Sequence, residues 1–225
     1  MAMMNNSEKK ILSVSPIDIS MEILLSALHL DREHELIDDI ITMHRAAIET
    51  AKPVAVFAPY PVDARDGVIR LNNVMLDAPF VYEKLSACDI VIPFVASCGN
   101  EIDEWSKTLD DSFEQFVADI LKQLCLKAIG ERLFSEVREK YFNDGEISTI
   151  NPGSLAEWPI ANQHLLFEIL GGVTGDIGVV LSDSCLMSPT KSWSGIMFQT
   201  EKVFHNCQLC PRTDCPNRKT PYIGN

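Results

Sequence analysis

The sequence predicts an α+β fold, in which helices pack on a twisted, mainly antiparallel β-sheet. Helical and β patterns come in blocks, with two helices first, then strands, then helices and strands mixed. This order lacks the regular alternation that is typical of a doubly wound fold. The longest apolar pattern has the helical period and extends from about residue 111 to residue 141. We therefore expect one long central helix packed against the sheet.

Two helices are expected in the first 51 residues. Ser20 is a typical cap for a short helix through Leu30, and Asp31 is a typical cap for a second helix that reaches about Ala51. The second helix carries apolar residues at spacings of three and four, which indicates a core-facing stripe. His44 lies within that stripe, and we interpret it as a hydrogen-bonded histidine at the edge of the core.

The apolar period changes after Pro53. Runs of β-branched and aromatic residues are bounded by Pro and by Asp-Gly, which is typical of strands. The expected elements are strands at 54–60, 68–71, 74–76 and 89–96, and a helix at 80–85. Small residues at 97–100 follow the last strand, and we interpret Cys98 as a small buried apolar residue rather than a thiol near a ligand.

The central helix is expected to start at a cap, Asp110 or Asp111, and to end near Tyr141. Asn143-Asp144-Gly145 stops it, because these residues favour turns. The remaining expected elements are a helix at 160–170 and strands at 177–181 and 195–199.

Composition limits the function classes. The 225 residues carry a formal net charge of −13, which argues against a nucleic-acid surface because phosphate binding needs concentrated Lys and Arg. No apolar run approaches the roughly 18 residues of a membrane span, and the first residues lack a secretory signal pattern. We expect a cytoplasmic protein that binds neither nucleic acid nor membrane. Residues 191–225 alone have an excess of three bases, which would favour an acidic partner or an anionic ligand, or else a solvated tail.

Residues 151–198 are the candidate site. A Pro-Gly turn, an apolar helix and a short β-rich run lead to a loop that is dense in Ser, Pro and Thr and ends at Ser194-Gly195. Hydroxyls and exposed backbone N–H groups between two apolar elements allow a close approach to a polar ligand. Trp158 and Trp193 flank the two loops, and either pocket walls or ordinary core packing fits them.

The order of these residues resembles the activation domain of cobalamin-dependent methionine synthase. The resemblance rests on Pro152-Gly153, Trp158-Pro159, Met187, Pro189 and Ser192-x-Ser194-Gly195. In that family, the two loops frame the S-adenosylmethionine site. The resemblance therefore implies that S-adenosylmethionine or the corrin is contacted by Pro152, Gly153, Ser154, Trp158, Pro159, Met187, Pro189, Ser192, Ser194 and Gly195.

The resemblance is thinner before residue 149. Residues 96–103 resemble the family's Thr-Ile-Gly segment, and residues 128–132 its Ala-Glu helix, in which Glu131 matches the family's Glu loosely. Two departures fall in the signature itself. The family's Arg falls on Thr149, and the family's Tyr falls on Ser154.

The last residues depart from the family pattern through C-x2-C-x4-C at Cys207, Cys210 and Cys215. Two thiolates two residues apart can bind one metal or one face of a cluster, and a third completes most of the coordination shell. An iron–sulfur cluster with Cys98 or Cys185 as fourth ligand and zinc with His205 or a remote Cys both fit, as does a loose tail or a redox thiol pair. We expect a methionine synthase activation-like domain at 1–200 and a Cys-rich appendage at 201–225.

Three functions remain open from the sequence. The first is a stand-alone activation subunit that reactivates cob(II)alamin of a methionine synthase or related corrinoid methyltransferase by reductive methylation with S-adenosylmethionine. The partner would supply the cobalamin, and a flavodoxin, a ferredoxin or the tail cluster the electron. The second is an iron–sulfur reductive activator of a corrinoid protein that does not bind S-adenosylmethionine. The third is a non-catalytic, zinc-pinned docking module for a corrinoid protein.

Overall fold

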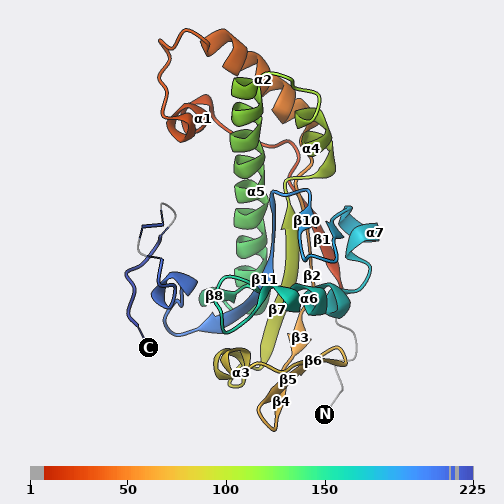
Figure 1. The fold of residues 1–225 in the computed structure, drawn as a ribbon. Coiled ribbons are helices and arrows are strands. Elements are labelled where there is room, and N and C mark those ends of the chain that lie inside the picture. The colour runs from red at the N-terminus through yellow and green to blue at the C-terminus, as the bar shows by residue number, and fades with distance from the viewer. Residues whose placement is uncertain (1–7, 213, 216–217, 225) are drawn as a thin grey trace.

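The computed structural model describes residues 8–212, 214–215 and 218–224. Its centre is an antiparallel sheet in the order β1-β2-β7-β11-β8, with the short β3 also paired to β7 (Figure 1). The strands are β1 (Lys10–Ser13), β2 (Val54–Phe57), β3 (Tyr60–Pro61), β7 (Ile90–Ser97), β8 (Glu146–Ile150) and β11 (Ser192–Thr200). The predicted α+β class with a mainly antiparallel sheet is confirmed.

One face of this sheet packs on the helix α5 (Ser112–Tyr141). Side chains alternate between the two faces of a strand, so every second residue points to α5. Phe57, Phe94 and Met197 face α5 and meet its Ile129 and Leu133 in one buried cluster. Asp111 caps α5 by accepting hydrogen bonds from the backbone N–H groups of Phe113 (2.8 Å) and Glu114 (3.1 Å), as the sequence predicts.

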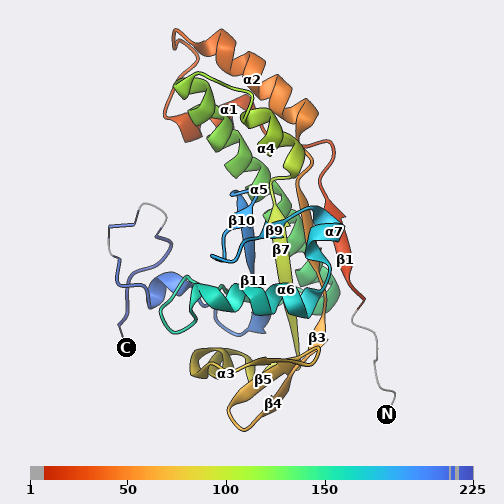
Figure 2. The ribbon, with the colours of Figure 1, turned by 45° about the vertical axis from the view of Figure 1, so that its right-hand side comes forward.

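The opposite face packs on the helix α6 (Gln163–Leu170), which crosses the strands as Figure 2 shows. Val56, Val95 and Ile196 point to this side and join Leu166 and Ile169 of α6 in the largest core cluster. The molecule therefore has three layers, α5, sheet and α6. The shorter elements around α6 are η1 (Ile160–Asn162), α7 (Val173–Ile177), β9 (Val180–Leu181) and β10 (Met187–Ser188).

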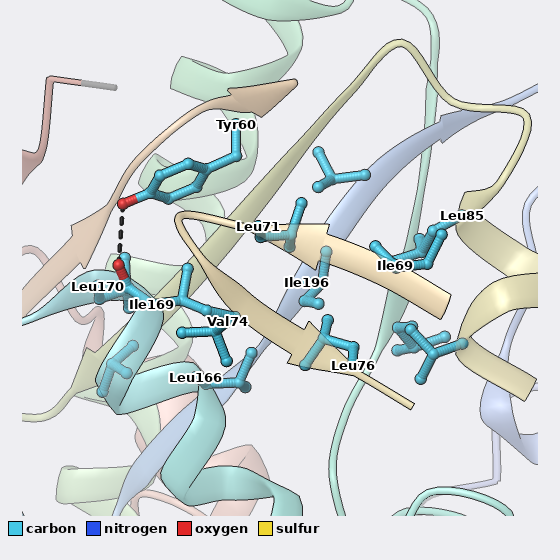
Figure 3. Packing of buried hydrophobic residues seen from close by; sticks show 14 of the residues in the cluster. Tyr60, Ile69, Leu71, Val74, Leu76, Leu85, Leu166, Ile169, Leu170 and Ile196 are labelled. Atoms are coloured by element: carbon cyan, nitrogen blue, oxygen red, sulfur yellow. Dashed lines mark hydrogen bonds between the residues drawn. The ribbon is translucent and has the colours of Figure 1, made fainter. Parts of the chain in front are cut away.

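A small second sheet extends the core beyond α6. Its strands β4 (Asp63–Arg65), β5 (Val68–Leu71) and β6 (Val74–Leu76) pair antiparallel, and the helix α3 (Pro79–Leu85) follows them. Ile69, Leu71 and Leu76 join Leu166 and Ile169 of α6 in the same buried cluster (Figure 3). The Tyr60 hydroxyl donates a hydrogen bond of 2.9 Å to the Ile169 carbonyl and so satisfies a polar group inside the cluster.

The first half of α5 projects past the sheet and carries a helical lobe. The helices α1 (Met21–Leu28), α2 (Ile37–Thr50) and α4 (Asn100–Ser106) surround it (Figure 1) and enclose a separate core cluster. His44 contacts the Ile19 carbonyl at 2.6 Å through its ring Nε2, as expected for a histidine at the edge of the core. Cys98 lies in the same cluster and is fully buried, so its interpretation as a small apolar residue is confirmed.

Some expected elements differ from the structure. The second helix starts at Ile37 rather than Asp31, whose carboxylate instead accepts a 2.9 Å hydrogen bond from the Glu33 N–H in a local turn. The strand predicted at 177–181 is mostly wrong. The helix α7 ends at Ile177 and Gly178 follows it in the left-handed conformation, so that only Val180–Leu181 forms a strand. The strands β1, β4, β8 and β10 and the helix α4 were not predicted.

Within the described ranges, none of the helices combines the length and the apolar character that a membrane crossing needs. The first strand, β1, and the segment that follows β11 lie on opposite sides of the molecule in both ribbon views (Figures 1 and 2).

Candidate functional site

The loop at 151–158, which joins β8 to η1, closes on itself. The Gly153 N–H donates to the Trp158 carbonyl at 2.8 Å, and the Ser154 N–H donates to the Asn151 carbonyl at 3.2 Å. Gly153 has φ +81°, and a Cβ there would lie 2.7 Å from Ile160 Cδ1. This turn therefore needs glycine.

Trp158 belongs to the core and not to a pocket wall. Its side chain is fully buried in the α6 cluster, and its Nε1 has no hydrogen-bond partner among the described atoms. Pro152 is buried as well. Of the predicted ligand residues in this loop and directly after it, Gly153, Ser154 and Pro159 are exposed.

Asn151 fastens the loop to its neighbours. Its Nδ2 donates a 2.7 Å hydrogen bond to the Ser194 carbonyl of β11, and its Oδ1 accepts a 3.0 Å bond from Asn206 Nδ2 of the C-terminal segment. Gly195 makes this approach possible, because a Cβ there would lie 2.6 Å from the Ile150 carbonyl oxygen and 2.3 Å from Asn151 Nδ2. Ser194 and Gly195 are buried and hold strands together.

The second loop is also fixed internally. The Ser192 hydroxyl contacts the Pro189 carbonyl at 2.7 Å and the Ser97 hydroxyl at 3.0 Å. Met187 lies on β10, which pairs only with β9 among the described strands. Of the predicted residues in this loop, Ser192 alone lines either of the two pockets described below.

The larger of these two pockets, here the α5 pocket, has a volume of about 630 Å³ and lies between α5, the sheet and the C-terminal segment. It brings together groups that are far apart in the sequence: Glu131 from α5, Thr149 from β8 and Ser192 from β11. The remaining lining residues are Gln123, Leu126, Lys127, Gly130, Phe134, Ile147, Trp193, Val203, Phe204, His205 and Lys219.

Trp193 gives this pocket a flat aromatic wall. Its ring stacks on Phe134 with centroids 5.7 Å apart and planes 6° apart, and it packs edge-to-face with Phe94, with centroids 4.6 Å apart and planes at 72°. Gly130 lies against the indole, since a Cβ at Gly130 would be 3.6 Å from Trp193 Cζ3. Because Gly130 has no side chain, the backbone of α5 lies close to the Trp193 ring at this point.

The polar groups of the α5 pocket come from two sides. On α5, Lys127 and Glu131 form an ion pair of 3.8 Å, and the Glu131 carboxylate can still accept hydrogen bonds from a ligand. On the C-terminal segment, His205 and Lys219 line the opposite side. The pocket therefore offers an aromatic surface, hydroxyls and charges of both signs.

The second pocket, here the loop pocket, has a volume of about 590 Å³ and lies on the other side of the 151–158 loop. Gly153, Ser154 and Pro159 line it together with Leu209 and Tyr222 of the C-terminal segment. The predicted ligand residues are thus divided, with three in the loop pocket and Ser192 in the α5 pocket.

The cysteine motif does not form a metal site in the described part of the chain. No group of three or more His, Cys, Asp or Glu side chains is placed there to hold a metal ion, so Cys207, Cys210 and Cys215 are not gathered around one point. Cys98 lies in the core of the helical lobe, whereas Cys210 packs against the α6 cluster. Cys98 is therefore not a fourth ligand.

Sequence reasoning missed most of the α5 pocket. Lys127, Gly130, Glu131 and Phe134 follow one another at spacings of three, one and three, which places them on one face of a helix. That spacing is visible in the sequence, but the apolar period of α5 dominates it. No local sequence pattern indicates that His205 and Lys219 also line the α5 pocket.

These features define a three-layered α+β domain with a pocket that is closed on one side by its own C-terminal segment. Among solved structures, the chain is similar to the "MetH Reactivation Domain bound to AdoHcy", with a TM-score of 0.65 and 15% sequence identity. The match covers 91% of this chain and 83% of that chain, and it shows that the two share their fold. No protein-family model and no curated protein matches the sequence.

Proposed function

We propose that this protein reactivates a corrinoid protein, and that its α5 pocket binds S-adenosylmethionine. One observation carries the proposal. Glu131, Thr149 and Ser192, three positions that the family resemblance singles out separately, line one pocket. The structural neighbour with the same fold is a reactivation domain and holds AdoHcy, a closely related ligand.

The lining of the α5 pocket fits such a ligand. Trp193 offers a flat apolar surface for a purine ring, and Thr149 and Ser192 carry hydroxyls that can bond to ribose or amino-acid groups. Glu131 can accept hydrogen bonds from an ammonium group or from ribose hydroxyls. A volume of about 630 Å³ is in the usual range for a ligand of this size.

In the proposed reaction, this domain closes over a partner's cob(II)alamin and presents the methyl group of S-adenosylmethionine. One electron from a reduced flavodoxin or ferredoxin and the transferred methyl group yield methylcobalamin and S-adenosylhomocysteine. The corrinoid belongs to the partner, a methionine synthase or a related corrinoid methyltransferase. This chain contributes the pocket and the surface that closes.

Calorimetric titration of the full chain with S-adenosylhomocysteine tests the proposal directly. We expect saturable binding that Glu131→Gln weakens several-fold, because a neutral amide accepts hydrogen bonds less strongly than a carboxylate. Glu139→Gln is the matched control, since Glu139 is an exposed carboxylate of the same helix outside the α5 pocket. Wild-type protein that does not bind, or equal binding by both variants, would contradict the assignment of this pocket.

Metal analysis separates this proposal from the two alternatives. The iron–sulfur activator requires iron and sulfide at Cys207, Cys210 and Cys215, and the docking module requires zinc there. The geometry of the described residues supports neither metal. Iron with acid-labile sulfide in protein purified without oxygen, together with no binding of S-adenosylhomocysteine, would favour the iron–sulfur activator instead.

A further inference from the structure

The C-terminal segment is fixed to the domain where it leaves β11. The Phe204 N–H donates a 2.7 Å hydrogen bond to the Ser148 hydroxyl of β8, and the Phe204 ring lies 6.2 Å from that of Phe80 and 4.6 Å from the Lys84 ammonium. Asn206 adds the bond to Asn151. His205, between these two anchors, therefore has a defined place at the α5 pocket.

Arg218 folds the rest of the segment back on itself. Its Nη1 donates to the carbonyls of Cys207 (2.7 Å) and Thr220 (3.1 Å), and its Nη2 donates to those of Cys210 (2.8 Å) and Arg212 (2.5 Å). A planar guanidinium can bond to several carbonyls at once, which an ammonium cannot reproduce. This arrangement brings Lys219 beside Cys207, where the Lys219 N–H meets the sulfur at 3.5 Å.

Lys219 is the basic side chain of this wall that other charges leave available. Lys127, across the pocket, pairs with Glu131, and Lys191 at the start of β11 pairs with Asp119 at 2.8 Å. None of the ion pairs among residues 8–212, 214–215 and 218–224 includes Lys219. Although the chain is strongly acidic, the α5 pocket thus has a lysine, Lys219, that makes no ion pair with the described residues.

We infer that Lys219 binds the carboxylate of the ligand in the α5 pocket. The inference rests on the proposed function and refines it, because it divides the ligand between two walls. The flat ring lies against Trp193, and the amino-acid end lies at the C-terminal segment. Thr149 cannot supply a positive charge from the strand, so the segment supplies it from the opposite side. The ligand class is an adenosine thioether or sulfonium that retains its amino-acid carboxylate.

Calorimetry on the full chain with two nucleosides, only one of which has the amino-acid group that carries this carboxylate, tests the inference. S-adenosylhomocysteine carries the amino-acid group, whereas 5′-methylthioadenosine lacks it. We expect Lys219→Gln to weaken binding of S-adenosylhomocysteine about tenfold, the usual order for one hydrogen bond to a charged group. Binding of 5′-methylthioadenosine should remain unchanged.

Two further variants serve as comparison. Lys202→Gln removes the same charge from an exposed position of the same segment outside the pocket, and both affinities should stay at the wild-type value. Arg218→Lys should reproduce the selective loss, because the segment then loses the contacts that place Lys219. Circular dichroism verifies that each variant is folded.

The results separate this inference from the proposed function. Wild-type protein that binds neither nucleoside overturns both. Wild-type protein that binds S-adenosylhomocysteine, with Lys219→Gln unchanged or weakened equally for both nucleosides, overturns the role of Lys219 alone.

Discussion

Cysteine sulfur atoms in this protein differ widely in their access to water. Burial raises the pKa of Cys98 to about 12, and burial likewise raises the pKa of Cys125 to about 12. Cys207, Cys210 and Cys215 are half-buried. Only the thiolate reacts quickly, so iodoacetamide at pH 8 should label the three C-terminal cysteines first and leave Cys98 and Cys125 unlabelled in folded protein.

Peptide mass spectrometry over a time course follows this labelling. The same protein in denaturant is the control, in which all seven cysteines should react at similar rates. Fast labelling of Cys98 in folded protein would show that the core of the helical lobe opens on the time scale of the experiment. Protection of all three C-terminal cysteines, released by a chelator, would instead indicate a bound metal.

At the residue scale, two glycines of the predicted site have a structural explanation that needs no ligand. Gly153 and Gly195 belong to the pattern that resembles a ligand site, yet backbone geometry explains both of them. Gly153 needs a positive φ, and Gly195 lets Asn151 and Ile150 approach its own strand, β11. A sequence pattern shows that a position is constrained, but it does not distinguish a close ligand from a close backbone.

At the scale of one element, α5 combines a packing role with a pocket wall. Glycine in a helix interior costs about 0.5–1 kcal/mol relative to alanine. A Cβ at Gly130 would meet Trp193 at an ordinary contact distance of 3.6 Å. Gly130→Ala should therefore raise the free energy of unfolding by about 0.5–1 kcal/mol and, by narrowing the α5 pocket, weaken nucleoside binding.

Urea unfolding and calorimetric titration measure the two effects on one preparation. Ser135→Ala, at an exposed position of α5 outside the α5 pocket, is the matched control and should leave nucleoside binding unchanged. A Gly130→Ala protein that is less stable than wild type would mean that Trp193 cannot accommodate the methyl group.

Elements with a strong periodic pattern were predicted well, and short elements that depend on partners were not. The cap at Asp111 and the long apolar period fix α5 locally. The strand β8 is only five residues long, and its pairing with β11 joins residues about 50 positions apart. No local signal marks such a strand, because its stability comes from the neighbour.

At the scale of the whole molecule, α5 joins two cores. Its first half packs in the helical lobe with Val117 and Leu121, and its second half packs on the sheet with Ile129 and Leu133. A helix of 30 residues is about 45 Å long, and its continuous hydrogen-bonded backbone couples the two cores. We expect one cooperative unfolding transition for both lobes.

Single-tryptophan variants report on the two lobes separately. Trp105 packs against the helical lobe and Trp193 against the sheet, so a protein with Trp105 alone and a protein with Trp193 alone carry one probe each. Within each variant, the fluorescence midpoint in urea should coincide with the midpoint from circular dichroism. A fluorescence midpoint that precedes the loss of helix in either variant would show that its lobe unfolds independently.

The three-layered arrangement follows from patterns that the sequence displays, whereas the α5 pocket does not. Its walls come from a helix, two strands and a segment that returns after residue 200. Asn151, through Asn206, and Arg218 hold that segment by hydrogen bonds, which follow no sequence period. Only the folded chain shows that they act together.

The hydrogen bond from Phe204 to Ser148 has a consequence for solubility. The sheet order ends at β8, and a terminal strand exposes backbone groups that can pair with another chain. The C-terminal segment meets β8 at this border through the hydrogen bond between the Phe204 N–H and the Ser148 hydroxyl, and it also lines the α5 pocket. A chain without the segment would lack Lys219 of the proposed ligand site, and its border strand β8 would be more open to pairing with a copy of the protein.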